Sequence, residues 1–222
     1  MIDSIVRLFA PFQCLGCGHE KDRLICQNCL ETLPRVPSRC YVCKATTRHY
    51  DVCESCKPRT PLRRVAVFAH HADLAKELVH TAKYERAKAG LFEIAEMMAV
   101  LLPYFDDDIV LVHVPTATSR IRERGYDQAE VIARRLTRQT NVPRARLLAR
   151  LGQAHQVGSK RSERIAHVKD VFRPVHEEKI KGAHIVLVDD VCTTGASLES
   201  AARTLKRAGA KRVDAIVFSQ PN

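Results

Sequence analysis

The sequence is poor in aromatic residues and has no long hydrophobic run. It contains no tryptophan, and aromatic residues make up 5% of its 222 residues. No apolar stretch approaches the roughly 18 residues of a membrane-spanning helix, and Asp3 and Arg7 interrupt the apolar start. We therefore expect neither a membrane span nor an ordinary secretory signal. Few rings are available for stacking on single-stranded nucleic acid, and the expected accessible ones are Tyr41, Tyr50 and Tyr126.

Only one cysteine follows residue 56, and the other eight form four Cys-x-x-Cys pairs within the first 56 residues. The pairs are Cys14 and Cys17, Cys26 and Cys29, Cys40 and Cys43, and Cys53 and Cys56. Each pair can place two thiolates about 2.3 Å from one Zn²⁺, and two pairs complete a tetrahedral site. Eight thiolates predict two structural zinc sites, because a site closed by four cysteines leaves no position for a catalytic water.

The short spacers favour zinc sites built from consecutive pairs, although interleaved pairing is also possible. Disulfides and redox-active Cys-x-x-Cys motifs are the alternatives. Four evenly spaced copies without the strand and helix of a thioredoxin-like motif count against both. Zinc-binding thiolates must stay reduced, which predicts a cytoplasmic protein.

Positive charge is concentrated in one part of the chain. The net charge is +11, and residues 120–164 contain twelve basic and four acidic residues. A concentrated excess can mark an anionic partner, whereas a dispersed excess serves solubility. Within this segment, Arg134, Arg135 and Arg138 fit either a solvated helix face or contacts with nucleic acid.

A change of composition near residue 60 predicts two parts, a zinc-ribbon module in residues 1–60 and a larger domain in residues 61–222. In the second part, strand and helix periodicities alternate. The expected strands are 65–69, 109–114, 184–188 and 212–219, and residues 147–151 form a strand or a helix end. The expected helices are 74–84, 89–102, about 127–139, and a last helix that ends before Gly209. This order predicts an α/β fold with a doubly wound, mainly parallel sheet.

The most informative motif, Val186 to Ser197, reads Val-Leu-Val-Asp-Asp-Val-Cys-Thr-Thr-Gly-Ala-Ser. A buried strand brings Asp189 and Asp190 to the carboxyl edge of the sheet, where such folds bind ligands. The next turn opens a helix whose free N–H groups and dipole suit a phosphate, and Gly195 allows close approach. Two carboxylates beside a phosphate can accept hydrogen bonds from vicinal hydroxyls or help to position Mg²⁺. The motif predicts a sugar-phosphate site. The alternative, a solvated turn without a ligand, would not explain why two charged residues directly follow a buried strand.

The same motif resembles the phosphoribosyl pyrophosphate (PRPP) signature of the type I phosphoribosyltransferases. The resemblance implies a phosphoribosyltransferase-like fold, PRPP as ligand, Mg²⁺ as cofactor and glycosyltransferase activity. It also implies that Asp189 and Asp190 hold the ribose 2′ and 3′ hydroxyls. The residues that it assigns to the 5′-phosphate are Thr193, Thr194, Gly195, Ala196 and Ser197.

Further motifs narrow the resemblance to the ComF family of competence-associated, phosphoribosyltransferase-like proteins, including its GntX-type members. They are Lys83-Tyr84, His113-Val114-Pro115-Thr116, Arg124-Gly125-Tyr126-Asp127-Gln128 and Gln156-Val157-Gly158. Members usually have Arg-Gly-Phe-Asn-Gln in place of the third motif, and four module cysteines are common where eight occur here. Membership implies a role in DNA uptake during natural transformation, with single-stranded DNA and other DNA-uptake proteins as possible partners.

Chemistry at C1 of PRPP needs cationic groups, because breaking the bond to pyrophosphate builds positive charge on the sugar and negative charge on the leaving group. Lys160, Arg161 and Arg164 lie in a Gly- and Ser-containing stretch and are the candidate catalytic residues. Arg124 and Gly125 are the candidates for the pyrophosphate end of the site.

Two functions fit these observations. The first is an enzyme that carries out Mg²⁺-dependent transfer or hydrolysis at C1 of PRPP, with an unidentified acceptor. The second is a non-catalytic protein that binds single-stranded DNA and uses its PRPP site as a sensor or retains it as a relic. Related enzymes cover the site with a hood, but only three residues, 220–222, follow the last expected strand. We therefore expect the zinc module or a partner to cover the site.

Overall fold

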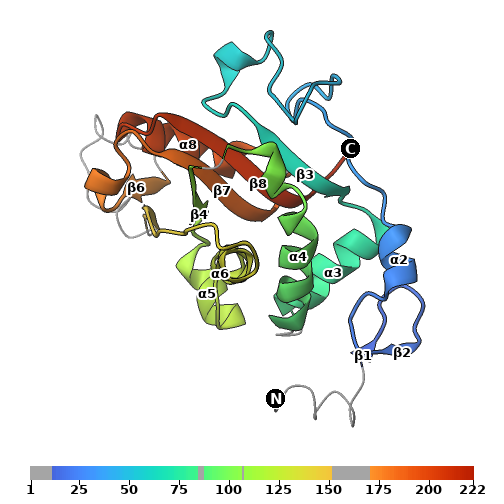
Figure 1. The fold of residues 1–222 in the computed structure, drawn as a ribbon. Coiled ribbons are helices and arrows are strands. Elements are labelled where there is room, and N and C mark those ends of the chain that lie inside the picture. The colour runs from blue at the N-terminus through green and yellow to red at the C-terminus, as the bar shows by residue number, and fades with distance from the viewer. Residues whose placement is uncertain (1–11, 85–87, 107, 152–170) are drawn as a thin grey trace.

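The computed structural model describes residues 12–84, 88–106, 108–151 and 171–222. Its centre is a four-stranded sheet in the order β3-β8-β7-β4 (Figure 1). The strands are β3 (Val65–His70), β4 (Ile109–His113), β7 (His184–Val191) and β8 (Arg212–Gln220). Each neighbouring pair is parallel, with His113 beside Val188 and Val188 beside Ile216. The parallel sheet confirms the expected α/β class.

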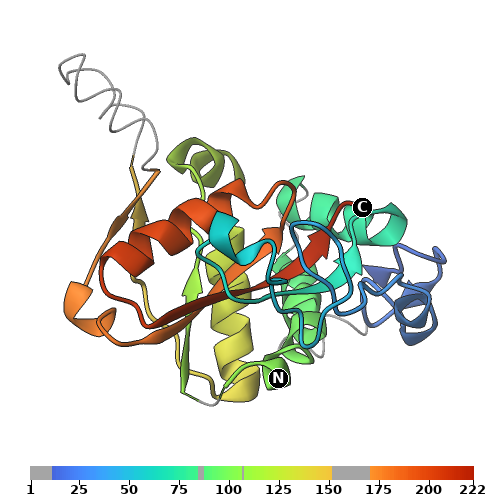
Figure 2. The same cartoon turned by 90° about the horizontal axis from the view of Figure 1, so that it is seen from above.

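Helices cover both faces of the sheet, as Figures 1 and 2 show. On one face lie α3 (Asp73–Tyr84), α4 (Lys88–Ala99) and α6 (Gln128–Thr140), and on the other lies α8 (Ala196–Arg207). Successive side chains of a strand point to opposite faces. Val186 of β7 accordingly joins the core under α4 and α6, while Leu187 joins the core under α8. Among the described residues, no helix is long and apolar enough to cross a membrane.

Shorter elements complete the described fold. They are β1 (Phe12–Gln13), β2 (Glu20–Lys21), α2 (Gln27–Glu31), α5 (Thr118–Arg124), β5 (Leu148–Arg150) and β6 (Phe172–Pro174). Strands β1 and β2 form one antiparallel pair, and β5 and β6 form another. Short 3-10 turns occur at Lys57–Arg59, Leu102–Tyr104 and Glu177–Lys179.

The amino-terminal segment, residues 12–60, packs against the rest of the chain in two places. Leu24 and Ile25 donate their backbone N–H groups to the buried Glu93 carboxylate of α4, at 2.6 and 3.0 Å. These two side chains belong to the core under α3 and α4, whereas Tyr41 and Val52 belong to the core under α8. The two halves of the segment therefore support mainly opposite faces of the sheet, although Tyr50 of the second half also belongs to the core under α3 and α4. The division near residue 60 stays a prediction.

Most of the expected strands and helices are present, with small differences in length. Asp127 begins α6 by accepting the N–H of Glu130, as expected of a capping residue. Residues 148–150 form a strand, and β7 continues through both aspartates to Val191, which pairs with Ser219 of β8. The sequence did not predict α5 or β6, because elements of seven and three residues are too short to show hydrophobic periodicity.

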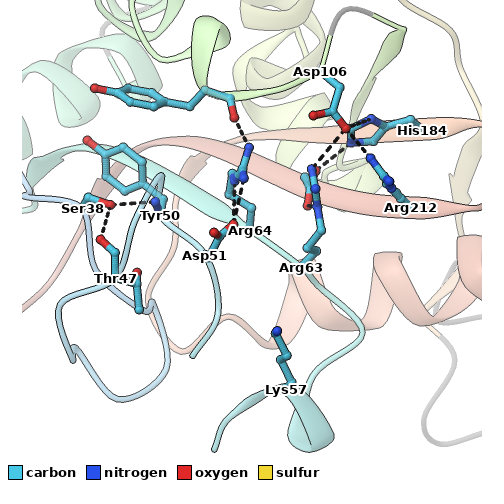
Figure 3. Close-up of polar contacts among 12 residues, drawn as sticks. Ser38, Thr47, Tyr50, Asp51, Lys57, Arg63, Arg64, Asp106, His184 and Arg212 are labelled. Atoms are coloured by element: carbon cyan, nitrogen blue, oxygen red, sulfur yellow. Dashed lines mark hydrogen bonds and ion pairs between the residues drawn. The ribbon is translucent and has the colours of Figure 1, made fainter. Parts of the chain in front are cut away.

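An ion-pair network lies at the amino-terminal edge of the sheet, at the other end of β7 from Asp189 and Asp190. Figure 3 shows Arg63, Asp106, His184 and Arg212 of this network. The fully buried Asp214 carboxylate accepts hydrogen bonds from Arg63 at 2.9 Å and from His184 at 2.7 Å. Asp106 pairs with Arg63, Arg212 and His184. Burial alone raises the pKa of Asp214, but the hydrogen bonds from His184 and Arg63 outweigh burial and place this pKa below its usual value.

The variant Asp214→Asn is expected to lower the free energy of unfolding by about 3 kcal/mol, because it leaves Arg63 and His184 beside a neutral partner. Since the folded-state pKa of Asp214 is lowered, its contribution to stability is present above the unfolded value of about 3.9 and is lost as pH falls through the folded value. Urea unfolding from neutral to acidic pH measures both effects. A variant as stable as the parent at neutral pH contradicts this role.

Candidate functional site

Two adjacent carboxylates stand at the carboxyl end of β7. Asp189 and Asp190 are half-buried, and their side chains accept the backbone N–H groups of Asp190 at 2.9 Å and Val191 at 2.8 Å. Burial, and then the neighbouring charge of Asp190, raises the pKa of Asp189 well above its usual range. Hydroxyl donors or a divalent cation would stabilise these carboxylates.

The turn after β7 opens helix α8 at the same edge of the sheet. Thr193, Thr194, Ala196 and Ser197 are exposed, while Gly195 is buried and caps α8 with a φ of +80°. The first N–H groups of a helix have no partner inside it and lie at the positive end of its dipole. The structure thus brings the five residues of the predicted phosphate turn together, next to the two carboxylates.

A lysine from another part of the chain faces these carboxylates. The Nζ of Lys83, near the end of α3, lies 2.7 Å from Oδ2 of Asp190. His71, directly after β3, bonds through Nδ1 to Oγ of Ser219 at 2.9 Å. Burial, followed by the charge of Lys83, lowers the pKa of His71, and Asp190 opposes this. The sequence pattern does not assign Lys83 to the site, although the motif Lys83-Tyr84 is a signal of it.

The junction of α5 and α6 holds the residues expected at the pyrophosphate end. Arg124 is buried, and its Nη1 donates to Oε1 of Gln128 at 3.0 Å. Gly125 ends α5 with a φ of +85°, a conformation that favours glycine. The Asp127 carboxylate accepts the N–H of Thr116 at 2.9 Å and its hydroxyl at 3.2 Å. The Asp127 carboxylate therefore connects the loop after β4 to the start of α6. The role of Arg124 and Gly125 at the pyrophosphate end stays a prediction.

A cavity of about 420 Å³ adjoins this junction. One wall is His113, which pairs with Val188, so the cavity lies next to the strand that carries the aspartates. Arg150 donates to the carbonyl of Pro115 at 3.3 Å; burial lowers its pKa, and the Asp189 charge opposes this. Nothing in a three-residue strand singles out its last residue, so the sequence did not indicate Arg150. The basic side chains that line the cavity are Lys88, Arg134, Arg146 and Arg150.

The candidate catalytic residues Lys160, Arg161 and Arg164 lie outside the described residues, as does the motif at residues 156–158. The strands on either side of this segment, β5 and β6, pair Arg150 with Phe172. The assignment of these three residues stays a prediction from the sequence.

The eight paired cysteines form two clusters, each made of consecutive pairs. In each cluster the four Sγ atoms lie within 4.8 Å of one another. The Sγ atoms of Cys17 and Cys26 are 3.9 Å apart, and those of Cys43 and Cys53 are 3.5 Å apart. A tetrahedron with Zn–S distances of about 2.3 Å has edges of about 3.8 Å, so both clusters fit zinc. The grouping favours consecutive over interleaved pairing. The first cluster is Cys14, Cys17, Cys26 and Cys29; the second is Cys40, Cys43, Cys53 and Cys56.

The three tyrosines expected to be accessible are buried, so that expectation is wrong. Tyr41, Tyr50 and Tyr126 are 4%, 8% and 9% exposed. The hydroxyl of Tyr126 donates to the carbonyl of Ala82 at 2.5 Å and joins the start of α6 to α3. A tyrosine can be buried wherever its hydroxyl finds a partner, and such long-range partners leave no local pattern in the sequence.

The arginines of α6 mostly form surface ion pairs. Arg134 pairs with Glu130 at 3.1 Å, and Arg135 pairs with Glu96 of α4 at 2.8 Å. Arg138 is exposed. These contacts favour a solvated helix face for Arg135, whereas Arg134 also lines the cavity.

The chain belongs to the phosphoribosyl transferase domain family, whose model matches residues 80–222. This stretch contains three of the four central strands, the carboxylate pair and the turn that opens α8.

Over most of its length, the chain is also similar to three curated proteins. Competence protein ComFC of Bacillus subtilis is 28% identical over 201 residues, covering 85% of this chain and 80% of the relative. Competence protein F of Haemophilus influenzae is 23% identical over 219 residues, covering 92% and 95%. DNA utilization protein YhgH of Escherichia coli is 27% identical over 206 residues, covering 85% and 87%. These relatives confirm the resemblance to the ComF family.

Proposed function

We propose that the chain binds PRPP with Mg²⁺ at the end of β7. The observation that carries this proposal is the pair of carboxylates that ends a buried strand directly before a helix-opening turn. The turn from Thr193 to Ser197 would hold the 5′-phosphate through N–H groups and hydroxyls. Asp189 and Asp190 would accept hydrogen bonds from the two ribose hydroxyls.

The carboxylates also fit Mg²⁺, which prefers oxygen ligands and is usually held by one or two carboxylates together with substrate phosphates. The raised pKa of Asp189 supports this, because burial, and then the charge of Asp190, leaves its carboxylate incompletely stabilised. Bound Mg²⁺ would neutralise charge on the pyrophosphate leaving group. Lys83 would exchange its ion pair with Asp190 for contacts with the ligand, and the positive charge of Arg150 would continue to act on Asp189.

We infer that this chemistry serves DNA handling in the cytoplasm. Two relatives carry competence names and a third a DNA-utilization name. Four basic side chains line the cavity beside the site, together with the carboxylates of Asp127 and Glu130. Basic side chains bind nucleic-acid phosphates. The protein would thus act at C1 of PRPP while holding single-stranded DNA, alongside other DNA-uptake proteins.

A non-catalytic PRPP sensor that binds single-stranded DNA is the second candidate. Arg124, a candidate for the pyrophosphate end, donates to Gln128, and the nearby Asp127 accepts from Thr116. This observation favours binding of the sugar phosphate without turnover.

Two measurements on the zinc-loaded protein test these proposals. PRPP with Mg²⁺ at a hundredfold excess over its Kd is expected to stabilise the fold by about 2.7 kcal/mol, which raises Tm by several degrees. No rise in Tm contradicts PRPP binding. Release of pyrophosphate, measured with and without single-stranded DNA, then separates the candidates: release supports the enzyme, and a stable complex without release supports the sensor.

A further inference from the structure

The second cysteine cluster is joined to the phosphate turn by one side chain. Tyr41 lies between two cysteines of that cluster, Cys40 and Cys43, and is buried. A Cβ atom built on Gly195 would lie 2.8 Å from Cε2 of the Tyr41 ring. The ring therefore occupies the space that a side chain at Gly195 would need, directly against the residue that caps α8.

The hydroxyl of Tyr41 continues this contact into the first turns of α8. It donates to Oε1 of Glu199 at 2.8 Å, and because it has a single proton it accepts from Oγ1 of Thr60 at 2.6 Å. The carbonyl of Tyr41 accepts from Nε2 of Gln220 at 3.3 Å. Tyr41 thus contacts the residue that caps α8, the first turn of α8 and the last strand.

The first cysteine cluster makes no comparable contact within the described residues. The chain between its two halves is held by Glu93 of α4, through Leu24 and Ile25, on the opposite face of the sheet. The two clusters therefore differ in what they support, although their ligands and spacings are alike.

We propose that Tyr41 is a positioning residue for the phosphate-binding turn, and that metal in the second cluster sets the affinity for the sugar phosphate. This inference rests on the proposed function, because it concerns the same ligand site. A metal bound by Cys40 and Cys43 fixes the backbone on both sides of Tyr41. The fixed ring then keeps Gly195 in its left-handed conformation, with the N–H groups that follow it directed at the ligand. Loss of the metal would free the segment between Cys40 and Cys43, and Gly195 could then leave its left-handed conformation.

The test measures binding of ribose 5-phosphate by calorimetry, since this probe uses the turn and the carboxylates but lacks pyrophosphate. Tyr41→Phe keeps the ring and removes the hydrogen bonds to Glu199 and Thr60. It is expected to weaken binding about tenfold, which corresponds to about 1.4 kcal/mol and lies within the range of a typical hydrogen bond. Glu199→Ala should weaken binding to the same extent, whereas Glu199→Gln, which keeps an acceptor for the Tyr41 hydroxyl, should restore it.

Tyr50→Phe is the matched control. Its hydroxyl donates to the carbonyl of Val36 at 3.3 Å, in the same module but away from the turn. We expect Tyr50→Phe to keep the parent affinity. We also expect Tyr41→Phe and Tyr50→Phe to have the same Tm without ligand. If Tyr41 had only a structural role, Tyr41→Phe would have the lower Tm.

The metal dependence is tested with two exposed cysteines, Cys43 of the second cluster and Cys17 of the first. Cys43→Ser is expected to lower the affinity for ribose 5-phosphate at least about tenfold more than Cys17→Ser does. Equal effects contradict the proposal, and if a cysteine variant does not fold, the Tyr41→Phe result decides. Parent protein that binds no ribose 5-phosphate refutes the proposed function. If the parent protein binds ribose 5-phosphate and Tyr41→Phe binds it with the same affinity, only this inference is refuted.

Discussion

Replacement of either aspartate at the end of β7 is expected to weaken PRPP binding by about a hundredfold or more. Each carboxylate would accept a charge-assisted hydrogen bond from a ribose hydroxyl, and Asn removes the charge that strengthens such bonds and holds Mg²⁺. Calorimetric titration of Asp189→Asn and Asp190→Asn with PRPP and Mg²⁺ measures the loss. Parent-like affinity in both variants would show that the ligand lies elsewhere.

Of the two variants, Asp189→Asn is expected to keep or gain stability. The folded-state pKa of Asp189 is raised, first by burial and then by the charge of Asp190. A carboxyl group with a raised pKa contributes stability that is present below its unfolded value and is lost as pH rises through the folded value. At neutral pH, Asp189→Asn removes this cost. Thermal unfolding without ligand should therefore show no decrease in Tm for Asp189→Asn.

A pH dependence of binding follows from the same pKa. Ribose hydroxyls need the ionised carboxylate as acceptor, so affinity for PRPP should rise as pH rises through the folded-state pKa of Asp189. Asp108→Asn is the matched control for charge, since Asp108 is exposed and lies near the opposite edge of the sheet. It should leave both the affinity and its pH dependence unchanged.

Removal of metal from the two cysteine clusters is the second large effect. Structural zinc contributes about 10–16 kcal/mol of apparent binding energy to a small zinc-dependent fold, comparable with the whole stability of a domain. Both halves of residues 12–60 take part in the main cores, through Ile25 and Leu33 on one face and Cys40 and Cys56 on the other. A strong chelator is therefore expected to lower Tm by more than about 15 °C.

The measurement combines thermal unfolding with metal analysis of the purified protein. Two zinc ions in each chain, and full recovery of Tm when zinc is returned under reducing conditions, are the expected results. Fewer than two ions in each chain, or a Tm that a chelator leaves unchanged while the thiols are oxidised, would contradict zinc and support disulfides.

The sequence predicted the features that depend on local pattern. The parallel sheet followed from alternating periodicities, and the grouping of the eight cysteines followed from their short spacers. Asp189 and Asp190 were placed at the sheet edge because they directly follow an apolar run. Each of these inferences needs only neighbouring residues in the chain.

The contacts that complete the candidate site were not predictable in this way. Lys83 meets Asp190, and Tyr41 meets Gly195, across more than a hundred residues of intervening chain. Such pairs depend on how α3 and the second cysteine cluster pack on the sheet, which no local pattern encodes. The bond between Arg124 and Gln128 is local, but it depends on the turn between α5 and α6, and the sequence did not predict α5.

A crystal structure of the zinc-loaded protein with PRPP and Mg²⁺ tests the central claim most directly. The account predicts the ribose hydroxyls on Asp189 and Asp190, and the 5′-phosphate on the turn from Thr193 to Ser197. Density for PRPP at another place, or an unoccupied turn at a PRPP concentration that saturates binding in solution, would contradict it.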